Sequence, residues 1–157
     1  MAANVPGMVY RLAVAPNGDR SMLYASDGCR DIYGVEPEEM VADASLAIKG
    51  VHRGDAEAQS RSILESAEQL APWDQHWREL RADGSVSWLH GVSRPHRAAD
   101  GSTVWDGVVL DETKVREAQE RLQLVIDNLP GSAVCLYDRE LRVRFCEGDA
   151  GQVCRPS

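Results

Sequence analysis

Apolar and polar residues alternate along residues 73–111 in a pattern that predicts three consecutive strands. The tetrapeptide Ala-Asp-Gly-Ser occurs twice within this stretch, at 82–85 and at 99–102. Asp-Gly between alternating apolar runs favours a tight hairpin turn, because both central residues tolerate positive φ. Two such turns predict an antiparallel meander with strands over about 73–81, 86–96 and 103–111. The alternation places Val86, Trp88 and Val92 on one face of the second strand, and Val104, Val108 and Leu110 at alternate positions of the third.

Two shorter strands are predicted near the N-terminus, over Gly7 to Ala15 and Ser21 to Ala25, with a turn at Asn17-Gly18. They form the first hairpin of the sheet. Two short helical turns are predicted within residues 26–40, followed by a helix of about 15 residues that ends at Leu70. The apolar face of that helix is predicted to hold Ala56, Ile63, Ala67 and Leu70. After the last strand the apolar period becomes helical, which predicts a helix from about 113 to 128.

Two stretches of the sequence carry recognisable motifs. Arg78, Asp83-Gly84 and Trp88 follow the spacing Arg-x-x-x-Asp-Gly-x-x-x-Trp with one extra residue, and Asp111-Glu112-Thr113 closes the last predicted strand. This stretch resembles the PAC motif of the sensory PAS domain, which closes with Asp-Ile-Thr. Upstream, the PAS signature is matched by Ser26, Ile32-Tyr33-Gly34 and Pro37-Glu38-Glu39-Met40. The resemblance implies an α+β fold, with a PAS-like five-stranded antiparallel sheet, short helices on one face and a C-terminal linker helix. It also implies a cleft that can hold a small ligand.

A short repeat predicts how the chain is divided, because Asn4-Val-Pro-Gly7 recurs as Asn128-Leu-Pro-Gly131 ahead of another strand-like run. We expect a PAS sensory domain with its PAC motif over 4–111 and a signalling linker helix over 112–128. Residues 129–157 are expected to be the truncated start of a second PAS-like domain, with strands over Ala133 to Tyr137 and Arg142 to Phe145. The sequence is therefore expected to be a fragment of a longer protein.

The charge of the chain argues against nucleic-acid binding, because the formal net charge is −8 and no window carries a basic stripe. No apolar run approaches the roughly 18 residues that a membrane span needs, and the first residues lack the features of a signal peptide. We expect a cytoplasmic protein without a nucleic-acid partner and without a membrane span.

Cysteine and histidine spacing gives no sign of a metal centre or a cofactor. Cys29, Cys135, Cys146 and Cys154 show no Cys-x-x-Cys pair, so neither a zinc site nor a disulfide framework is predicted. Buried or incidental thiols are the favoured interpretation. The histidines lack the spacing of known metal motifs, and no nucleophile with a base or pair of carboxylates is apparent. We therefore expect no metal, no resident cofactor and no catalytic activity in these residues.

The ligand cleft that the resemblance implies has four candidate residues: Cys29, Trp73, His76 and Trp77. Trp73 and Trp77 share one face of a predicted strand, and Asp74, His76 and Arg78 share the other. The mixed pattern does not decide which face is internal. Inward tryptophans would stack on an apolar ligand, although core packing is the commoner role, and the polar trio is more often a solvated face than a carboxylate site.

A haem or flavin sensor is the least favoured interpretation of this cleft. The light-sensing branch of the family carries Asn-Cys-Arg-Phe-Leu-Gln, and here only Cys29-Arg30 matches, because Asp31 replaces an apolar residue. Haem needs an axial ligand, but the long helix contains no histidine. His52 precedes that helix, where a capping or surface role is favoured.

Signal output is predicted at the junction of the last strand with the linker helix, at Arg78, Asp111 and Thr113. Thr113 is predicted as a helix N-cap whose hydroxyl accepts an amide two or three residues on. The resemblance makes Arg78 the candidate partner of Asp111. Along the helix, an a/d heptad seam for a parallel dimer is formed by Val115, Ala118, Leu122, Val125 and Leu129. Packing of the helix on its own sheet is nearly as favoured.

Together these features predict a sensory, relay and dimerisation module of a multidomain signal-transduction protein. The expected partners are a second copy of the chain and a downstream output domain in the same chain, of the histidine kinase or cyclic-di-GMP type. The alternative is a ligand-free module for protein–protein interaction.

Overall fold

The computed structural model describes residues 6–128 and 133–148, in two compact units. The first unit spans Met1–Thr113 and the second Lys114–Ser157.

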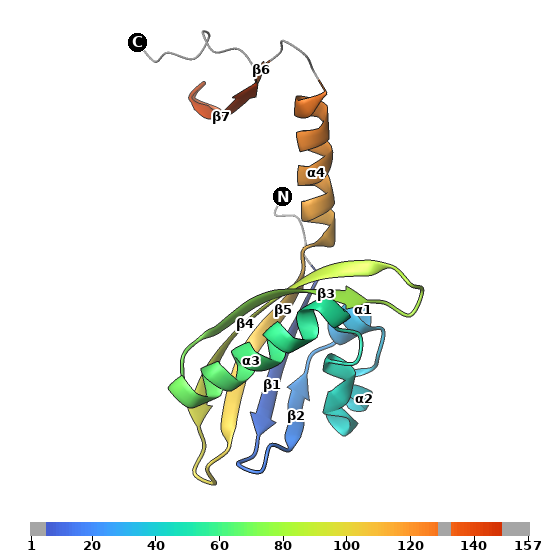
Figure 1. The fold of residues 1–157 in the computed structure, drawn as a ribbon, viewed down its shortest axis with the longest axis vertical. Helices are drawn as coiled ribbons and strands as arrows, with labels where there is room; N and C mark the ends of the chain where they lie inside the picture. The colour runs from blue at the N-terminus through green and yellow to red at the C-terminus, as the bar shows by residue number, and fades with distance from the viewer. Residues whose placement is uncertain (1–5, 129–132, 149–157) are drawn as a thin grey trace. The chain divides into compact units, whose positions relative to one another are not determined.

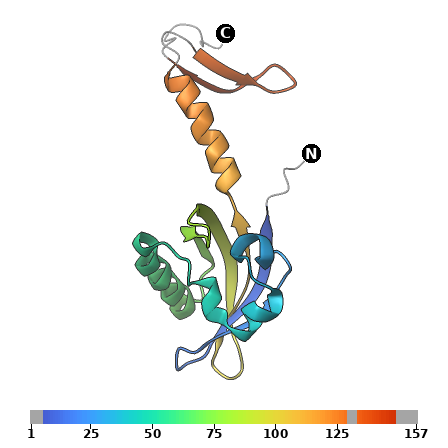
Figure 2. The ribbon, with the colours of Figure 1, turned by 90° about the vertical axis from the view of Figure 1, so that its right-hand side faces the viewer.

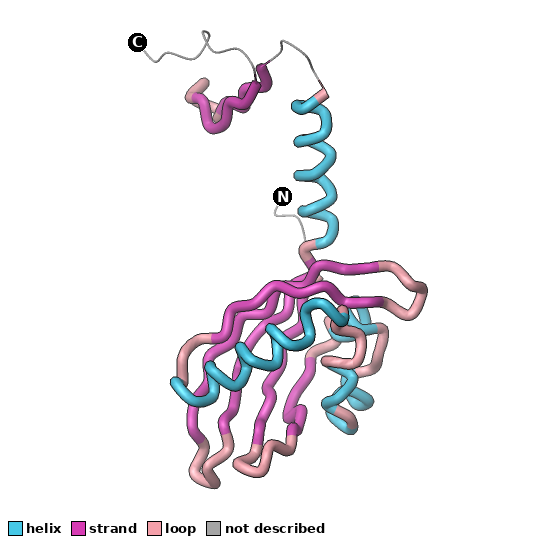
Figure 3. The backbone as a smooth tube through the Cα atoms, viewed as in Figure 1, coloured by secondary structure: helices cyan, strands magenta, loops and turns pink. Residues whose placement is uncertain are grey.

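A five-stranded sheet dominates the first unit, and its strands run side by side in Figure 3. Its order is β2-β1-β5-β4-β3, and every neighbouring pair is antiparallel. The central place of β5 joins the N-terminal hairpin to the C-terminal meander, which confirms the predicted five-stranded antiparallel sheet. The strands are β1 Gly7–Val14, β2 Arg20–Ala25, β3 Trp73–Leu80, β4 Val86–Arg97 and β5 Thr103–Asp111.

The helices of this unit pack on one face of the sheet. They are α1 Cys29–Tyr33, α2 Pro37–Ala42, the 3-10 helix η1 Ala44–Ala47 and α3 Arg53–Gln69. Figure 1 shows α3 crossing the strands, and the turned view in Figure 2 shows it standing to one side of them. Side chains from the helices and from this face of the sheet form a single hydrophobic core.

The two short helices end and begin where the sequence provides the right residues. Gly34 closes α1 in the left-handed region, with φ of 71°, which a residue without Cβ adopts readily. Pro37 opens α2, where the amide hydrogen that proline lacks would have no helical partner. Glu36 and Glu39 complete a reciprocal capping box at the same end.

The long helix α3 starts earlier than predicted and turns a different face to the core. His52 is its N-cap, and the Nδ1 atom accepts a hydrogen bond from Gly54 N at 3.1 Å, which confirms the capping role. Ile63 and Ala67 pack against the core as predicted, but Ala56 and Leu70 are exposed. The apolar pattern misled here because the most buried positions of the face are polar: Gln59 and Ser66.

The core also lies on the other side of the meander from the apolar residues that the pattern emphasised. Val86 is exposed, and Trp88, Val92 and Val108 are only half-buried. The core residues lie between them, and on β3, β4 and β5 they are Trp73, Trp77, Leu89, Trp105 and Val109. Val104 is also buried, although it is not part of this core. The strand alternation was right, but glycine and serine among the inward positions hid which face was internal.

The second unit contains α4 Thr113–Asp127, which begins in the first unit's last residue, and a hairpin of β6 Ala133–Tyr137 and β7 Val143–Gly148. Cys135, predicted to be an incidental thiol, is disulfide-bonded. Among the described residues, no helix is both long and apolar enough to cross a membrane.

Candidate functional site

An apolar cavity of about 60 Å³ lies between the sheet and its helices. Tryptophans from β3 and β5 form much of its wall, and α3 closes it with Gln59 and Ile63. Pockets that bind small molecules are typically apolar, with a few placed polar groups. The cavity has this composition, so it is the first candidate for a ligand site.

The tryptophan rings are held in place by hydrogen bonds to α3. Trp73 Nε1 donates to Ser62 Oγ at 2.8 Å, and Trp105 Nε1 donates to Ser66 Oγ at 3.0 Å. These bonds explain why serines occupy the inner face of α3, because a buried indole N–H needs an acceptor. The bonds fix the rings and leave their apolar surfaces to line the cavity.

A glycine on β4 makes room for two of these rings. A Cβ atom at Gly91 would lie 2.5 Å from Trp73 Cζ3 and 2.9 Å from Trp77 Cζ3. The ring centroids of Trp73 and Trp77 are 5.7 Å apart. Gly91 therefore allows both tryptophans to lie directly on the neighbouring strand.

Four polar side chains line this otherwise apolar cavity: Tyr10, Tyr33, Gln59 and Ser93. Ser93 is buried, and its Oγ atom has no partner of good hydrogen-bond geometry among the described residues. Burial raises the pKa of the Tyr10 phenol, and the neighbouring Ser93 hydroxyl opposes that rise. An unsatisfied buried hydroxyl is costly, so Ser93 is suited to bond a ligand or a water molecule.

Glu79 lies at the far end of β3 from this cavity, on the wall of an open hollow of about 610 Å³. Only 4% of the residue is exposed, and Trp77 Nε1 donates to its Oε2 atom at 3.2 Å. Burial raises the pKa of the Glu79 carboxyl from 4.5 to about 7, although this hydrogen bond favours the charged form. The carboxyl therefore titrates near neutral pH.

Of the four predicted cleft residues, only Trp73 and Trp77 line the cavity. Cys29 is fully buried, and its thiol donates to the Val35 carbonyl at 3.2 Å. Burial raises the pKa of the Cys29 thiol, as expected for a structural rather than a reactive cysteine. His76 lies on the opposite face of the sheet, because it alternates with Trp77 along β3.

The junction after β5 contains Asp111 as predicted, but its partner is Arg81 rather than Arg78. Arg81 Nη2 and Asp111 Oδ2 are 2.5 Å apart. Arg81 follows β3 at the hairpin turn, and it also donates to Ser87 on β4. The pair therefore connects the end of β5 to the β3–β4 hairpin.

Arg78 instead joins β3 to the start of α3. Its Nη2 and Nε atoms donate to the Asp55 carboxylate at 2.6 and 2.9 Å, and its backbone N donates to the same group at 2.9 Å. These bonds lower the pKa of Asp55 from 3.8 to about 2, with the Arg78 side chain as the main cause. The Arg78 guanidinium is thus held by Asp55 and does not serve as the partner of Asp111.

Thr113 is the first residue of α4, and its hydroxyl bonds to residues of β4 and β5. Thr113 Oγ1 accepts from Trp88 N at 2.9 Å and donates to Asp111 Oδ1 at 2.6 Å. The same Asp111 oxygen accepts from Thr113 N at 3.0 Å. Asp111 thus accepts the first amide of the helix, and the threonine hydroxyl binds the helix start to β4. The bond predicted from the Thr113 hydroxyl to an amide two or three residues on stays a prediction.

The predicted seam lies on α4 in an exposed position. Val115, Ala118, Leu122 and Val125 are all exposed, whereas Leu129 is outside the described residues. Leu124, which the seam does not include, is exposed to 61%.

Several residues of these sites were not predicted from the sequence. Ser93 and Gln59 belong to no recognisable motif, and their burial follows only from the strand and helix registers. Arg81 was within three residues of the predicted Arg78, but only the hairpin geometry shows which arginine reaches Asp111. These sites are formed by contacts between elements, which residue spacing along one chain does not reveal.

Comparison with known proteins identifies the fold. The family described as the PAS fold matches residues 22–109. No protein among the curated sequences matches the chain.

Among solved structures, the chain resembles a sensory box histidine kinase/response regulator from Burkholderia thailandensis, with TM-score 0.56, 16% identity, and coverage of 77% of this chain and 89% of that one. It also resembles the N-terminal domain of a diguanylate cyclase with PAS/PAC sensor from Marinobacter aquaeolei, with TM-score 0.57, 15% identity, and coverage of 70% and 98%. A PAS domain from Colwellia psychrerythraea gives TM-score 0.50, 20% identity, and coverage of 69% and 86%.

Proposed function

Because this chain belongs to the PAS-fold family, we propose that it is a sensory module that binds a small, mainly apolar ligand between its sheet and helices and relays binding through the β5–α4 junction. The observation that carries the proposal is the cavity lined by Trp73, Trp77 and Trp105, with the unsatisfied hydroxyl of Ser93 among them. Such a site combines a stacking surface with one polar anchor.

The size of the cavity limits the ligand. A cavity of about 60 Å³ has room for a few water molecules, whereas pockets for drug-sized ligands usually measure several hundred Å³. The ligand is therefore a compact molecule of few heavy atoms, with one hydrogen-bonding group for Ser93.

The relay follows the strands that line the cavity. Ser93 lies on β4 and Val109 on β5, and both contribute to the cavity wall. Towards the end of β5 the two strands are joined through Trp88, because Trp88 N donates to Thr113 Oγ1 and Glu112 N donates to Trp88 O at 2.9 Å. A ligand that separates β4 from β5 would thus disturb the bonds that hold the start of α4.

Ethanol is a suitable probe of the cavity, because it is small enough for this volume, is largely apolar and has one hydroxyl group. Its titration is followed through the indole N–H signals of the four tryptophans in a ¹H–¹⁵N spectrum. We expect shifts for Trp73, Trp77 and Trp105, and none for Trp88, which lies on the other face of the sheet. Ser93→Leu, which fills the cavity, should abolish the shifts, whereas Val92→Ala on the outward face of β4 should preserve them.

Equal shifts at all four tryptophans would indicate non-specific binding and contradict the proposal. No shifts at any concentration, in a protein that still forms dimers, would favour the alternative of a ligand-free interaction module.

We further propose that α4 forms a parallel homodimer through its a/d seam and passes the signal to a kinase or cyclase output domain in the same chain. The exposed apolar residues Val115, Leu122 and Val125 support this, because single helices of this length are marginal in water without a packed apolar face. Leu122→Glu should convert dimer to monomer in light scattering without loss of the sheet's circular dichroism. Leu124→Glu, outside the seam, should leave the dimer intact; the same loss in both variants would contradict the seam.

A further inference from the structure

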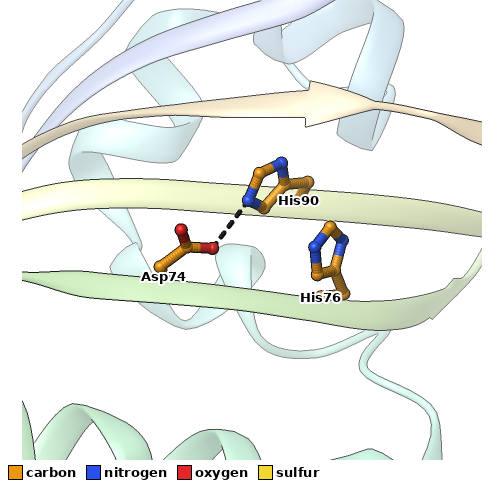
Figure 4. A group of neighbouring side chains, drawn as sticks. All are labelled: Asp74, His76 and His90. Atoms are coloured by element: carbon orange, nitrogen blue, oxygen red, sulfur yellow. Dashed lines mark hydrogen bonds and ion pairs between the residues drawn. The ribbon is translucent and has the colours of Figure 1, made fainter.

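A cluster of histidine and acidic side chains lies on the outward face of the sheet, away from the apolar cavity. His76 on β3 and His90 on β4 are directly paired across the two strands. Their rings stack with centroids 3.9 Å apart and an interplanar angle of 17°. Figure 4 shows Asp74, from the same face of β3, pointing toward the His90 ring.

Glu112 lies beside the Nδ1 atom of each ring. Its Oε1 atom lies 3.0 Å from His90 Nδ1, and its Oε2 atom lies 3.3 Å from His76 Nδ1. A carboxylate only accepts hydrogen bonds, so a neutral His90, with a single N–H, can donate to Glu112 or to Asp74 but not to both. With the proton on Nδ1, the other nitrogen, Nε2, carries a lone pair that can bind a metal ion.

With the proton on Nδ1, two acceptors face each other. His90 Nε2 lies 2.7 Å from Asp74 Oδ1, which is hydrogen-bond distance. A neutral His90 that donates to Glu112 has no second proton to place between these two atoms. A cation between them, either a second proton or a metal ion, lets His90 interact favourably with both carboxylates.

We propose that Asp74, His76 and His90 bind one divalent transition-metal ion, for which Zn²⁺ is the representative, and that Glu112 orients both imidazole ligands. One ligand atom from each of the three residues lies within 4.8 Å of the others. Zinc sites have bonds of roughly 2.0–2.2 Å to nitrogen and oxygen. Small side-chain rotations therefore suffice to close the site, and water is left to complete the coordination.

A divalent ion also suits the charges of the cluster. One such ion is shared by two neutral rings, so it places no net charge on either of the imidazoles stacked 3.9 Å apart. The charges of Asp74 and Glu112 together balance such an ion. Carboxylates that accept the second N–H of a metal-bound histidine commonly fix its tautomer and orientation, which is the position of Glu112 here.

Glu112 connects this site to the strand-to-helix junction, because Asp111 and Thr113 are its neighbours in sequence. Metal binding on this face is nevertheless independent of whether the inward cavity takes a ligand.

The test is titration of the full chain, free of any affinity tag and kept oxidised, with Zn²⁺ by calorimetry and with Co²⁺ by visible absorption. We expect one ion per chain and the Co²⁺ spectrum of nitrogen and oxygen ligands. Loss of a residue that only supports a metal ligand typically weakens metal binding by about 10- to 100-fold, and we expect Glu112→Gln to fall within this range. His90→Ala and Asp74→Asn remove ligands, so they should weaken binding by more than that.

His96→Ala is the matched control, because His96 lies on the outward face of the same strand, and its Nδ1 atom is 3.9 Å from Asp106 Oδ2. It should bind the ion as the wild type does. Circular dichroism of each variant confirms that the sheet is intact.

Three results would overturn the proposal: no uptake of Zn²⁺ or Co²⁺ by the wild type, equal binding by wild type and His90→Ala, or a Co²⁺ spectrum dominated by thiolate ligands. The first would show that the cation between His90 and Asp74 is a proton.

Discussion

The two faces of β3 differ in chemistry although they alternate residue by residue along a single strand. The inward residues Trp73 and Trp77 are buried in the core, and the outward residues Asp74 and His76 are exposed. A single strand thus has an apolar cavity on one face and a polar cluster on the other. Substitutions on the inward face should therefore lower the free energy of unfolding strongly, and substitutions on the outward face should lower it little. Variants of adjacent residues on β3 test this difference directly.

Trp77→Ala should produce the largest loss. Trp77 is 2% exposed, lines the cavity and contacts the core, so its removal creates a large void. Truncation of a buried tryptophan costs about 3–5 kcal/mol in the free energy of unfolding. The neighbouring outward variant His76→Ala should cost less than about 1 kcal/mol, since it loses only partly solvated contacts. Urea unfolding of both proteins measures the difference, and equal losses would refute the assignment of the two faces.

Glu79→Gln should reveal the cost of a buried charge on the inward face. The folded-state pKa of about 7 lies above the value of 4.5, so the folded protein holds more protons than the unfolded chain between these pH values. Wild-type stability should therefore fall relative to the variant as pH rises from about 4.5 to 7, by about 2 kcal/mol. Urea unfolding of both proteins across this range gives the comparison. A constant difference would show that Glu79 is hydrated in the folded state.

Asp55→Asn should give a pH dependence of the opposite sign. The folded-state pKa of Asp55 is about 2, below its ordinary 3.8, because Arg78 stabilises the carboxylate. The contribution of the Asp55 carboxylate to the free energy of unfolding is therefore fully present above about pH 4 and is lost as pH falls toward 2. Since both side chains are partly exposed, the wild type should exceed the variant by only about 1 kcal/mol at pH 7.

Asp106→Asn is the matched control for Asp55. The pKa of Asp106 is also lowered by an arginine, Arg11, but this pair is about half exposed on the outward face. Its loss should have a smaller effect. A larger effect at Asp106 than at Asp55 would contradict the prediction that the less exposed ion pair contributes more to stability.

The sequence predicted the strands well because local signals define them. Two Asp-Gly turns and one Asn-Gly turn fixed the hairpins, and Gly84 and Gly101 do adopt positive φ. The same signals did not identify the internal face. Trp73 and Trp77 share their face with Gln75 and Glu79, and only the packing of α3 decides between that face and the polar one.

The sites were predicted less well because their residues come together from separate elements. Asp111 and Thr113 were recognised from a motif, but the true partner Arg81 depends on where the β3–β4 hairpin turns. His76 and His90 are 14 residues apart and meet only through the β3–β4 register, and Glu112 reaches both from the end of β5. Metal motifs with short spacing do not detect such a cluster.

The smallest predicted effect concerns the junction between β5 and α4. Thr113→Val keeps the shape of the side chain but removes the acceptor of the Trp88 amide, whose bond to Thr113 Oγ1 measures 2.9 Å. Because this site is partly exposed and water can replace the hydroxyl, the loss should be about 0.5–1 kcal/mol.

That loss should be local, and amide hydrogen exchange can locate it. Trp88 should exchange a few-fold faster, while amides of the core strands keep the protection that reports global unfolding. Thr103→Val makes the same change at the other end of β5, where the hydroxyl accepts from Arg97 Nη1 at 2.6 Å, and it should not alter exchange at Trp88. If Thr113→Val leaves Trp88 protected, or accelerates exchange throughout the sheet, the hydroxyl is not the connection between α4 and β4, and signal transfer would have to pass through Asp111 and Arg81 instead.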